Sequence, residues 1–87
     1  MRYKIYEIRF TDASKEQYYS LPEKLKRQVS KKLERIAKDP YTGKPLQASF
    51  KGLFSYRVGK LRIIYKIDRE EIVIIVVGIG FRKHIYQ

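Results

Sequence analysis

Apolar and polar residues alternate with a period of two in residues 2–10 (RYKIYEIRF) and in residues 55–65, on either side of Gly59-Lys60. This period is typical of strands that bury one face, so it predicts a first strand at 2–10 and a two-stranded hairpin at 55–65. Residues 72–79 are apolar at nearly every position, which indicates a last strand that is buried on both faces and lies centrally in the sheet. Gly80 is expected to end that strand.

Between the first strand and the hairpin, the apolar residues are instead spaced as they are in helices. Thr11 or Asp12 can cap a short helix at about 13–20. Pro22 suits the first turn of a second helix, which runs to about Lys38 and turns one apolar stripe toward the core: Leu25, Val29, Leu33, Ile36 and Ala37. The opposite side of this helix is basic. It is expected to be a solvated face, with nonspecific attraction of RNA as the alternative.

The order of these elements is strand, two helices, then three strands. It predicts an α+β fold in which two N-terminal helices pack on one face of a small, mainly antiparallel four-stranded sheet (β-α-α-β-β-β). No repeat or linker divides the 87 residues, so one small domain is expected to span 1–87.

The hairpin places two arginines opposite each other. If Gly59-Lys60 is a two-residue loop, Arg57 faces Arg62 across the pair. Alternation then puts both on the face turned away from the helices, together with Ser55. Like charges in opposed positions destabilise a hairpin, so the pair indicates a site for an anion such as phosphate, whose oxygens match the planar fork of arginine. The alternative is that both are ordinary surface residues of a basic protein.

The net charge of the chain limits the classes of partner that it is expected to bind. Twenty Lys and Arg against nine Asp and Glu give a formal net charge of +11, so nucleic acid or an acidic protein is the expected partner.

Cysteine is absent and His84 is the only histidine, which excludes disulfides, thiolate nucleophiles and two-histidine metal sites. No metal or other cofactor is expected. Neither a bilayer-spanning run nor a signal-peptide core is evident, which predicts a cytoplasmic protein without membrane contact.

The tail after the last strand returns to basic and aromatic residues. If the last strand lies beside the hairpin, its exit brings Arg82 and Tyr86 toward the surface that carries Arg57 and Arg62. Three guanidinium groups and a phenol would then share one concave patch. The alternatives are that Tyr86 packs back on the sheet and that His84 is a plain surface residue.

Three segments in fixed order, Lys44-Pro45-Leu46, residues 52–65 (GLFSYRVGKLRIIY) and residues 80–86 (GFRKHIY), resemble the RelE/ParE toxin superfamily. The characteristic parts are the R-V-G-x-x-R-I-I-Y hairpin and the G-x-R-x-x-x-Y tail. The S-L-P turn into a basic helix also fits, so the resemblance covers essentially the whole chain. It implies a toxin held inactive in a hetero-oligomer by an acidic, RelB-like antitoxin. RelE-like members enter the ribosomal A site and cut the mRNA there.

The resemblance also implies roles for single residues. Arg57 and Arg62 match the hairpin residues that hold and polarise the scissile phosphate. Arg82 matches the tail arginine, and Tyr86 the near-terminal tyrosine that orients or activates the attacking 2′-hydroxyl. Contacts to the RNA backbone that do not read sequence are implied for a further set: Lys51, Lys60, Lys83 and His84.

Two positions depart from the family pattern. Ser55 stands where many RelE-like toxins have another basic residue, and Phe81 where many have histidine. Because arginine and tyrosine both titrate far above neutral pH, the site lacks an obvious general base, and His84 is a hypothetical one. The resemblance nevertheless implies a ribosome-dependent endoribonuclease. The alternatives are a ParE-like toxin that inhibits DNA gyrase without chemistry of its own and a non-catalytic RNA-binding module.

Overall fold

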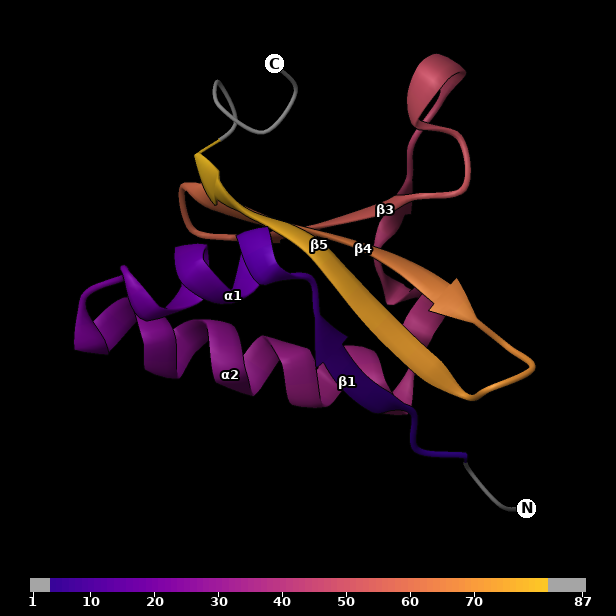
Figure 1. Cartoon of the computed structure of the whole chain (residues 1–87), viewed down its shortest axis with the longest axis horizontal. Helices are drawn as coiled ribbons and strands as arrows, with labels where there is room; N and C mark the ends of the chain where they lie inside the picture. The colour runs from indigo at the N-terminus through magenta and orange to yellow at the C-terminus, as the bar shows by residue number, and fades with distance from the viewer. Residues whose placement is uncertain (1–3, 82–87) are drawn as a thin grey trace.

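The computed structural model describes residues 4–81, which form one five-stranded sheet with two helices on one face (Figure 1). The helices are α1 (Asp12–Tyr19) and α2 (Glu23–Lys38), followed by two short 3-10 turns, η1 (Pro40–Thr42) and η2 (Ala48–Phe50). The strands are β1 (Glu7–Phe10), β2 (Lys44–Pro45), β3 (Phe54–Val58), β4 (Leu61–Asp68) and β5 (Val73–Phe81). Their order across the sheet is β1-β5-β4-β3-β2. The predicted α+β class and the helix layer are confirmed.

The predicted number of strands is wrong by one. The additional strand, β2, pairs antiparallel with the start of β3, with Lys44 opposite Ser55 and Pro45 opposite Phe54. Two residues are too few to show a period of two, and proline argues against a strand in sequence patterns. The sheet is otherwise antiparallel except where β1 runs parallel to β5.

The expectation that Gly80 ends the last strand is also wrong. Gly80 lies inside β5 and pairs with Arg62, and the strand continues to Phe81. A glycine keeps its backbone donor and acceptor, so a strand with partners on the neighbouring strand can continue through it. The central place of this strand is confirmed, because β5 has β1 on one side and β4 on the other.

The core lies between α2 and the sheet. Val29 and Ile36 of α2 are fully buried, as are Ile63, Tyr65 and Ile74 of the sheet. The predicted apolar stripe of α2 therefore faces the core, with Leu25 only partly buried at its first turn.

Within residues 4–81, neither helix has the length and apolar character needed to cross a membrane.

Helix α1 covers the edge of β5 beyond the point where β1 ends. Thr11 caps the helix as predicted, because its hydroxyl accepts a hydrogen bond from the Ser14 amide. The fully buried Ser14 hydroxyl then donates to the Val76 carbonyl at 2.6 Å, and the Gln17 side-chain oxygen accepts from the Ile79 amide at 2.8 Å. Two side chains of α1 thus replace the missing strand partner of β5.

Candidate nucleic-acid site

The hairpin has the register that the sequence predicts. Arg57 is the direct partner of Arg62, and Val58 is the partner of Leu61. Gly59 has φ +60°, the sign that a II′ hairpin turn requires at its first loop position and that glycine adopts without strain. The two arginines therefore lie on neighbouring strands, on the face of the sheet opposite α1 and α2.

Ser55 holds one of these arginines in place. Its hydroxyl accepts a hydrogen bond from Nη1 of Arg62 at 3.1 Å. Ser55 is 4% exposed, Arg62 is half-buried and Arg57 is exposed. Among residues 4–81, no carboxylate lies within the 4.0 Å of an ion pair from either arginine. The Arg62 guanidinium is thus oriented by a neutral partner, and neither arginine forms an ion pair within the described residues.

The arginine pair lines a cleft of about 400 Å³ at the edge of β3 where β2 ends. Residues from three segments line it: Thr42, Gly43, Lys44, Ser55, Tyr56, Arg57 and Arg62. The pairing of β2 with β3 brings Lys44 beside Ser55 and adds a third cation. On the next strand, Gly80 is the partner of Arg62 and Gly78 the partner of Ile64. Glycine at both positions means that β5 places no side chain beside Arg62 and Ile64 there.

A buried tyrosine fixes the loop that forms one wall of this cleft. The Tyr65 hydroxyl donates to the Pro40 carbonyl at 2.7 Å and accepts from the Gly43 amide at 3.1 Å. The side chain is 0% exposed, and burial raises the pKa of Tyr65 to about 12. Glycine is required at position 43, because a Cβ there would collide with the tyrosine oxygen.

The structure brings together only some of the predicted site residues. Arg57 and Arg62 share the cleft. Lys51 is exposed in the turn after η2, Lys60 is exposed in the hairpin loop, and neither lines the cleft. Four predicted residues lie outside the described residues: Arg82, Lys83, His84 and Tyr86. Lys44 was not predicted as a site residue, since only the two-residue pairing of β2 with β3 brings it to the cleft.

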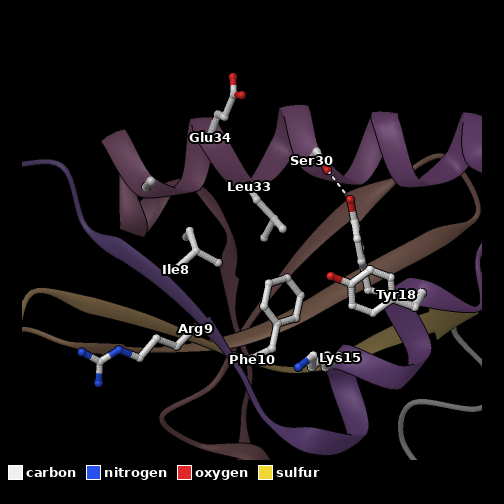
Figure 2. Close-up of a pocket in the computed structure, with 10 residues that line it drawn as sticks. Ile8, Arg9, Phe10, Lys15, Tyr18, Ser30, Leu33 and Glu34 are labelled. Atoms are coloured by element: carbon white, nitrogen blue, oxygen red, sulfur yellow. Dashed lines mark hydrogen bonds between the residues drawn. The ribbon is translucent and has the colours of Figure 1, made fainter.

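A second concave surface, which the sequence did not predict, lies between β1 and the helices (Figure 2). This groove has a volume of about 650 Å³. Ile8, Phe10 and Leu33 point into it, and Tyr18 closes one end with a hydrogen bond of 2.6 Å to Ser30 (Figure 2). The groove runs beside the outer edge of β1, which is a terminal strand of the described sheet. An apolar groove beside a free strand edge is suited to a protein segment.

The chemistry of the cleft follows from its side chains. Arg57, Arg62 and Lys44 supply donors and positive charge for a phosphate group. The lining contains no carboxylate and no histidine, so within the described residues the cleft offers charge and orientation without a general base. Among residues 4–81, no three acidic or histidine side chains gather as metal ligands would.

The family of the chain is shown by comparison with known proteins. The family model for the ParE toxin of the type II toxin–antitoxin system parDE matches residues 8–86. Toxin RelG of Mycobacterium tuberculosis (strain ATCC 25618 / H37Rv) is 30% identical over 84 residues, which cover 94% of this chain and 97% of RelG.

Solved structures agree with this assignment. The RelBE2 toxin–antitoxin complex of M. tuberculosis contains a chain with a TM-score of 0.83 and 29% identity, with 90% of this chain and 92% of that chain covered. The isolated RelE toxin of E. coli shares the fold with a TM-score of 0.77 at 20% identity, over 93% of this chain and 90% of that chain. The superfamily predicted from the hairpin and tail motifs is confirmed: the chain belongs to the RelE/ParE superfamily and is a toxin of a type II toxin–antitoxin system.

Proposed function

We propose that this toxin cleaves mRNA in the ribosomal A site, with Arg57 and Arg62 binding the scissile phosphate. The observation that carries the proposal is the opposed arginine pair, which has no carboxylate partner within the described residues. Such a pair lowers hairpin stability unless an anion lies between the two charges. The resemblance to RelE-like toxins adds the ribosome as the place of cleavage.

The proposed reaction is an internal phosphoryl transfer. The 2′-oxygen of one nucleotide forms a bond to the adjacent phosphorus, and the bond from phosphorus to the 5′-oxygen of the next nucleotide breaks. The 2′-hydroxyl loses its proton to a base, and the leaving 5′-oxygen gains one. Arg57 and Arg62 stabilise the charge that grows on the non-bridging oxygens, while the hydrogen bond from Arg62 to Ser55 keeps that guanidinium in position. The proposed roles of Arg82, Tyr86 and His84 concern residues outside the described part of the chain.

The test is controlled expression of the toxin in a bacterial host, followed by mapping of the 5′ ends of translated mRNAs. Codon-phased cuts are expected for the wild type. Loss of one preorganised donor to a transition-state oxyanion typically lowers the rate by about 100-fold or more, so Arg62→Ala is expected to reduce cutting to that extent. Arg69→Ala removes an exposed cation from the β4–β5 turn and is the matched control. Undiminished cutting by the Arg62→Ala protein would refute the assignment.

One observation favours a second function. Inhibition of DNA gyrase by a ParE-like toxin needs no general base, and the described lining of the cleft contains no carboxylate or histidine. In the same experiment, DNA damage with intact messages would support gyrase inhibition and exclude mRNA cleavage.

The partner proposed for the groove beside β1 is the antitoxin. The chain carries a formal charge of +11, so an acidic partner is favoured electrostatically. An amphipathic antitoxin segment would bury its apolar residues against Ile8, Phe10 and Leu33 (Figure 2). Acidic residues flanking that segment would face Lys15 and Arg9 at the rim. The RelBE2 complex of M. tuberculosis, whose toxin resembles this chain, supports the expectation of an antitoxin.

A further inference from the structure

Helix α2 carries a second concentration of positive charge, on the opposite side of the molecule from the arginine cleft. Five basic residues lie along its outer surface, all of them exposed: Lys24, Arg27, Lys31, Arg35 and Lys38. We call this set the α2 basic stripe. At about 100° per residue, the five positions fall within about 80° of the helix circumference and extend about 21 Å along its axis.

The stripe points directly away from the sheet. Val29, Leu33 and Ile36 bury the opposite side of α2 in the core. The arginines of the cleft lie on the other face of the sheet, which α2 does not cover. A single ligand chain bound in the cleft therefore does not neutralise the stripe, and the two basic surfaces can contact different segments of a larger ligand.

The residues of the stripe form no ion pair within the described part of the chain. The ion pair of α2 joins Lys26 to Glu23 at 3.0 Å, and neither residue belongs to the stripe. Among residues 4–81, no carboxylate oxygen lies within 4.0 Å of a stripe nitrogen, and the acidic residues that border the stripe are Glu34 and Asp39, beside Lys31, Arg35 and Lys38. Successive members are three or four positions apart, the spacing at which like charges disfavour a helix. A linear polyanion along the helix would remove this repulsion.

The stripe fits a phosphate backbone better than a protein surface. Protein interfaces are centred on apolar and aromatic anchors, and no apolar residue interrupts the stripe. The exposed large apolar residues among those described lie on other elements: Ile5, Tyr19, Tyr41, Phe50 and Phe81. One cation per helical turn, about 5.4 Å apart, instead presents a regular row of donors to successive phosphates.

We propose that the α2 basic stripe binds the phosphate backbone of RNA, as a surface separate from the arginine cleft. The proposal rests on the proposed function only in its choice of RNA over DNA. The stripe supplies charge without base-edge recognition, so its binding is independent of sequence and falls steeply with salt. In a ribosome-dependent toxin, it would hold the protein against structured RNA while the cleft binds the message.

The test is binding of the full-length toxin to a 20-base-pair RNA duplex of arbitrary sequence, measured by fluorescence anisotropy between 50 and 300 mM KCl. The stripe variant combines Lys31→Gln, Arg35→Gln and Lys38→Gln. The matched control combines Lys4→Gln, Lys66→Gln and Arg69→Gln, which removes the same charge from exposed positions elsewhere. Glutamine preserves helix propensity, so the stripe variant is expected to melt at or above the wild-type temperature.

The slope of log K against log salt falls by about one for each phosphate that a variant no longer neutralises. We therefore expect the stripe variant to lose about 2–3 in slope and roughly 100-fold or more in affinity at 100 mM KCl. The control variant is expected to keep its slope and lose less than about 5-fold. Arg35→Gln alone should lower the slope by about one, which provides a milder variant if the triple is unstable.

If the two triple variants lost the same affinity and the same salt slope, the proposal would be overturned. Duplex binding would then depend on the net charge of the protein and not on the position of the stripe. The same stripe dependence with a DNA duplex, at equal or higher affinity, would retain a phosphate site but overturn the choice of RNA. The proposal would also be overturned if the stripe variant lost binding to the antitoxin but kept its binding to the RNA duplex. Cleavage is not measured in this assay. A toxin that binds the duplex through the stripe but cuts no mRNA would refute only the proposed function.

Discussion

Replacement of Tyr65 by phenylalanine tests how the cleft wall is held. The change removes one oxygen from a fully buried side chain and leaves two groups without a partner, the Pro40 carbonyl and the Gly43 amide. Each buried group left unsatisfied costs about 1–3 kcal/mol, so the free energy of unfolding is expected to fall by about 2–6 kcal/mol in total. For a domain of this size, that corresponds to a melting temperature lower by roughly 10–40 °C.

The pH dependence gives the same prediction a second, independent readout. Burial raises the pKa of Tyr65 to about 12 in the folded protein, against about 10 for an unperturbed tyrosine. A raised folded-state pKa contributes stability that is complete below pH 10 and is lost as the pH rises through 12. The stability difference between wild type and Tyr65→Phe should therefore shrink by up to about 3 kcal/mol between pH 9 and pH 12.

The assay is urea unfolding of both proteins, followed by circular dichroism at several pH values. Tyr41→Phe is the matched control, because Tyr41 belongs to the same loop and is 54% exposed, and within the described residues its hydroxyl makes no hydrogen bond. It should unfold like the wild type. Neutral surface substitutions scatter by about 0.5 kcal/mol in the free energy of unfolding. A smaller loss than this for Tyr65→Phe would refute the conclusion that the Tyr65 hydroxyl holds the loop. So would a stability difference that stays constant from pH 9 to pH 12.

Two further predictions concern the cleft and the groove. Ser55→Ala removes the acceptor for Arg62, and since a hydrogen bond to a charged group contributes about 1.5–3 kcal/mol, mRNA cutting should fall by about 10-fold or more. Ser55→Thr keeps the hydroxyl and should retain most activity, so equal activity of the alanine variant and the wild type would contradict a positioning role. Tyr19→Ala removes an aromatic ring that is 63% exposed at the groove. Calorimetry should show about 10-fold weaker antitoxin binding with an unchanged melting temperature, whereas unchanged affinity would place the antitoxin elsewhere.

The hairpin was predictable because local chemistry alone determines it. Alternation selects the buried face, and Gly59 at the loop supplies the positive φ that fixes the register of Arg57 against Arg62. The same reasoning located α2, since its five apolar residues repeat at helical spacing. Both elements are specified by residues close to one another in sequence.

The features that the sequence did not reveal depend on distant partners. Strand β2 exists because β3 offers an edge to Lys44 and Pro45, which have little strand propensity of their own. Ser14 is fully buried because the Val76 carbonyl, 62 positions away, needs a donor. The hydrogen bond between Ser55 and Arg62 is an exception, since its partners are seven positions apart, but it depends on side-chain orientations that the alternation of residues does not specify. The serine that looked like a departure from the family pattern is therefore a partner of the arginine.

The central position of β5 has a consequence for the timing of folding. Its pairing with β1 joins Glu7 to Val73, which are 66 positions apart in sequence. During synthesis, β1 and both helices are made before β5 exists, so their apolar faces have no complete sheet to pack against. Cooperative folding must wait until residues 73–81 have emerged. On the proposed function, a nascent copy of the toxin is therefore inert toward the ribosome that makes it until β5 has joined the sheet.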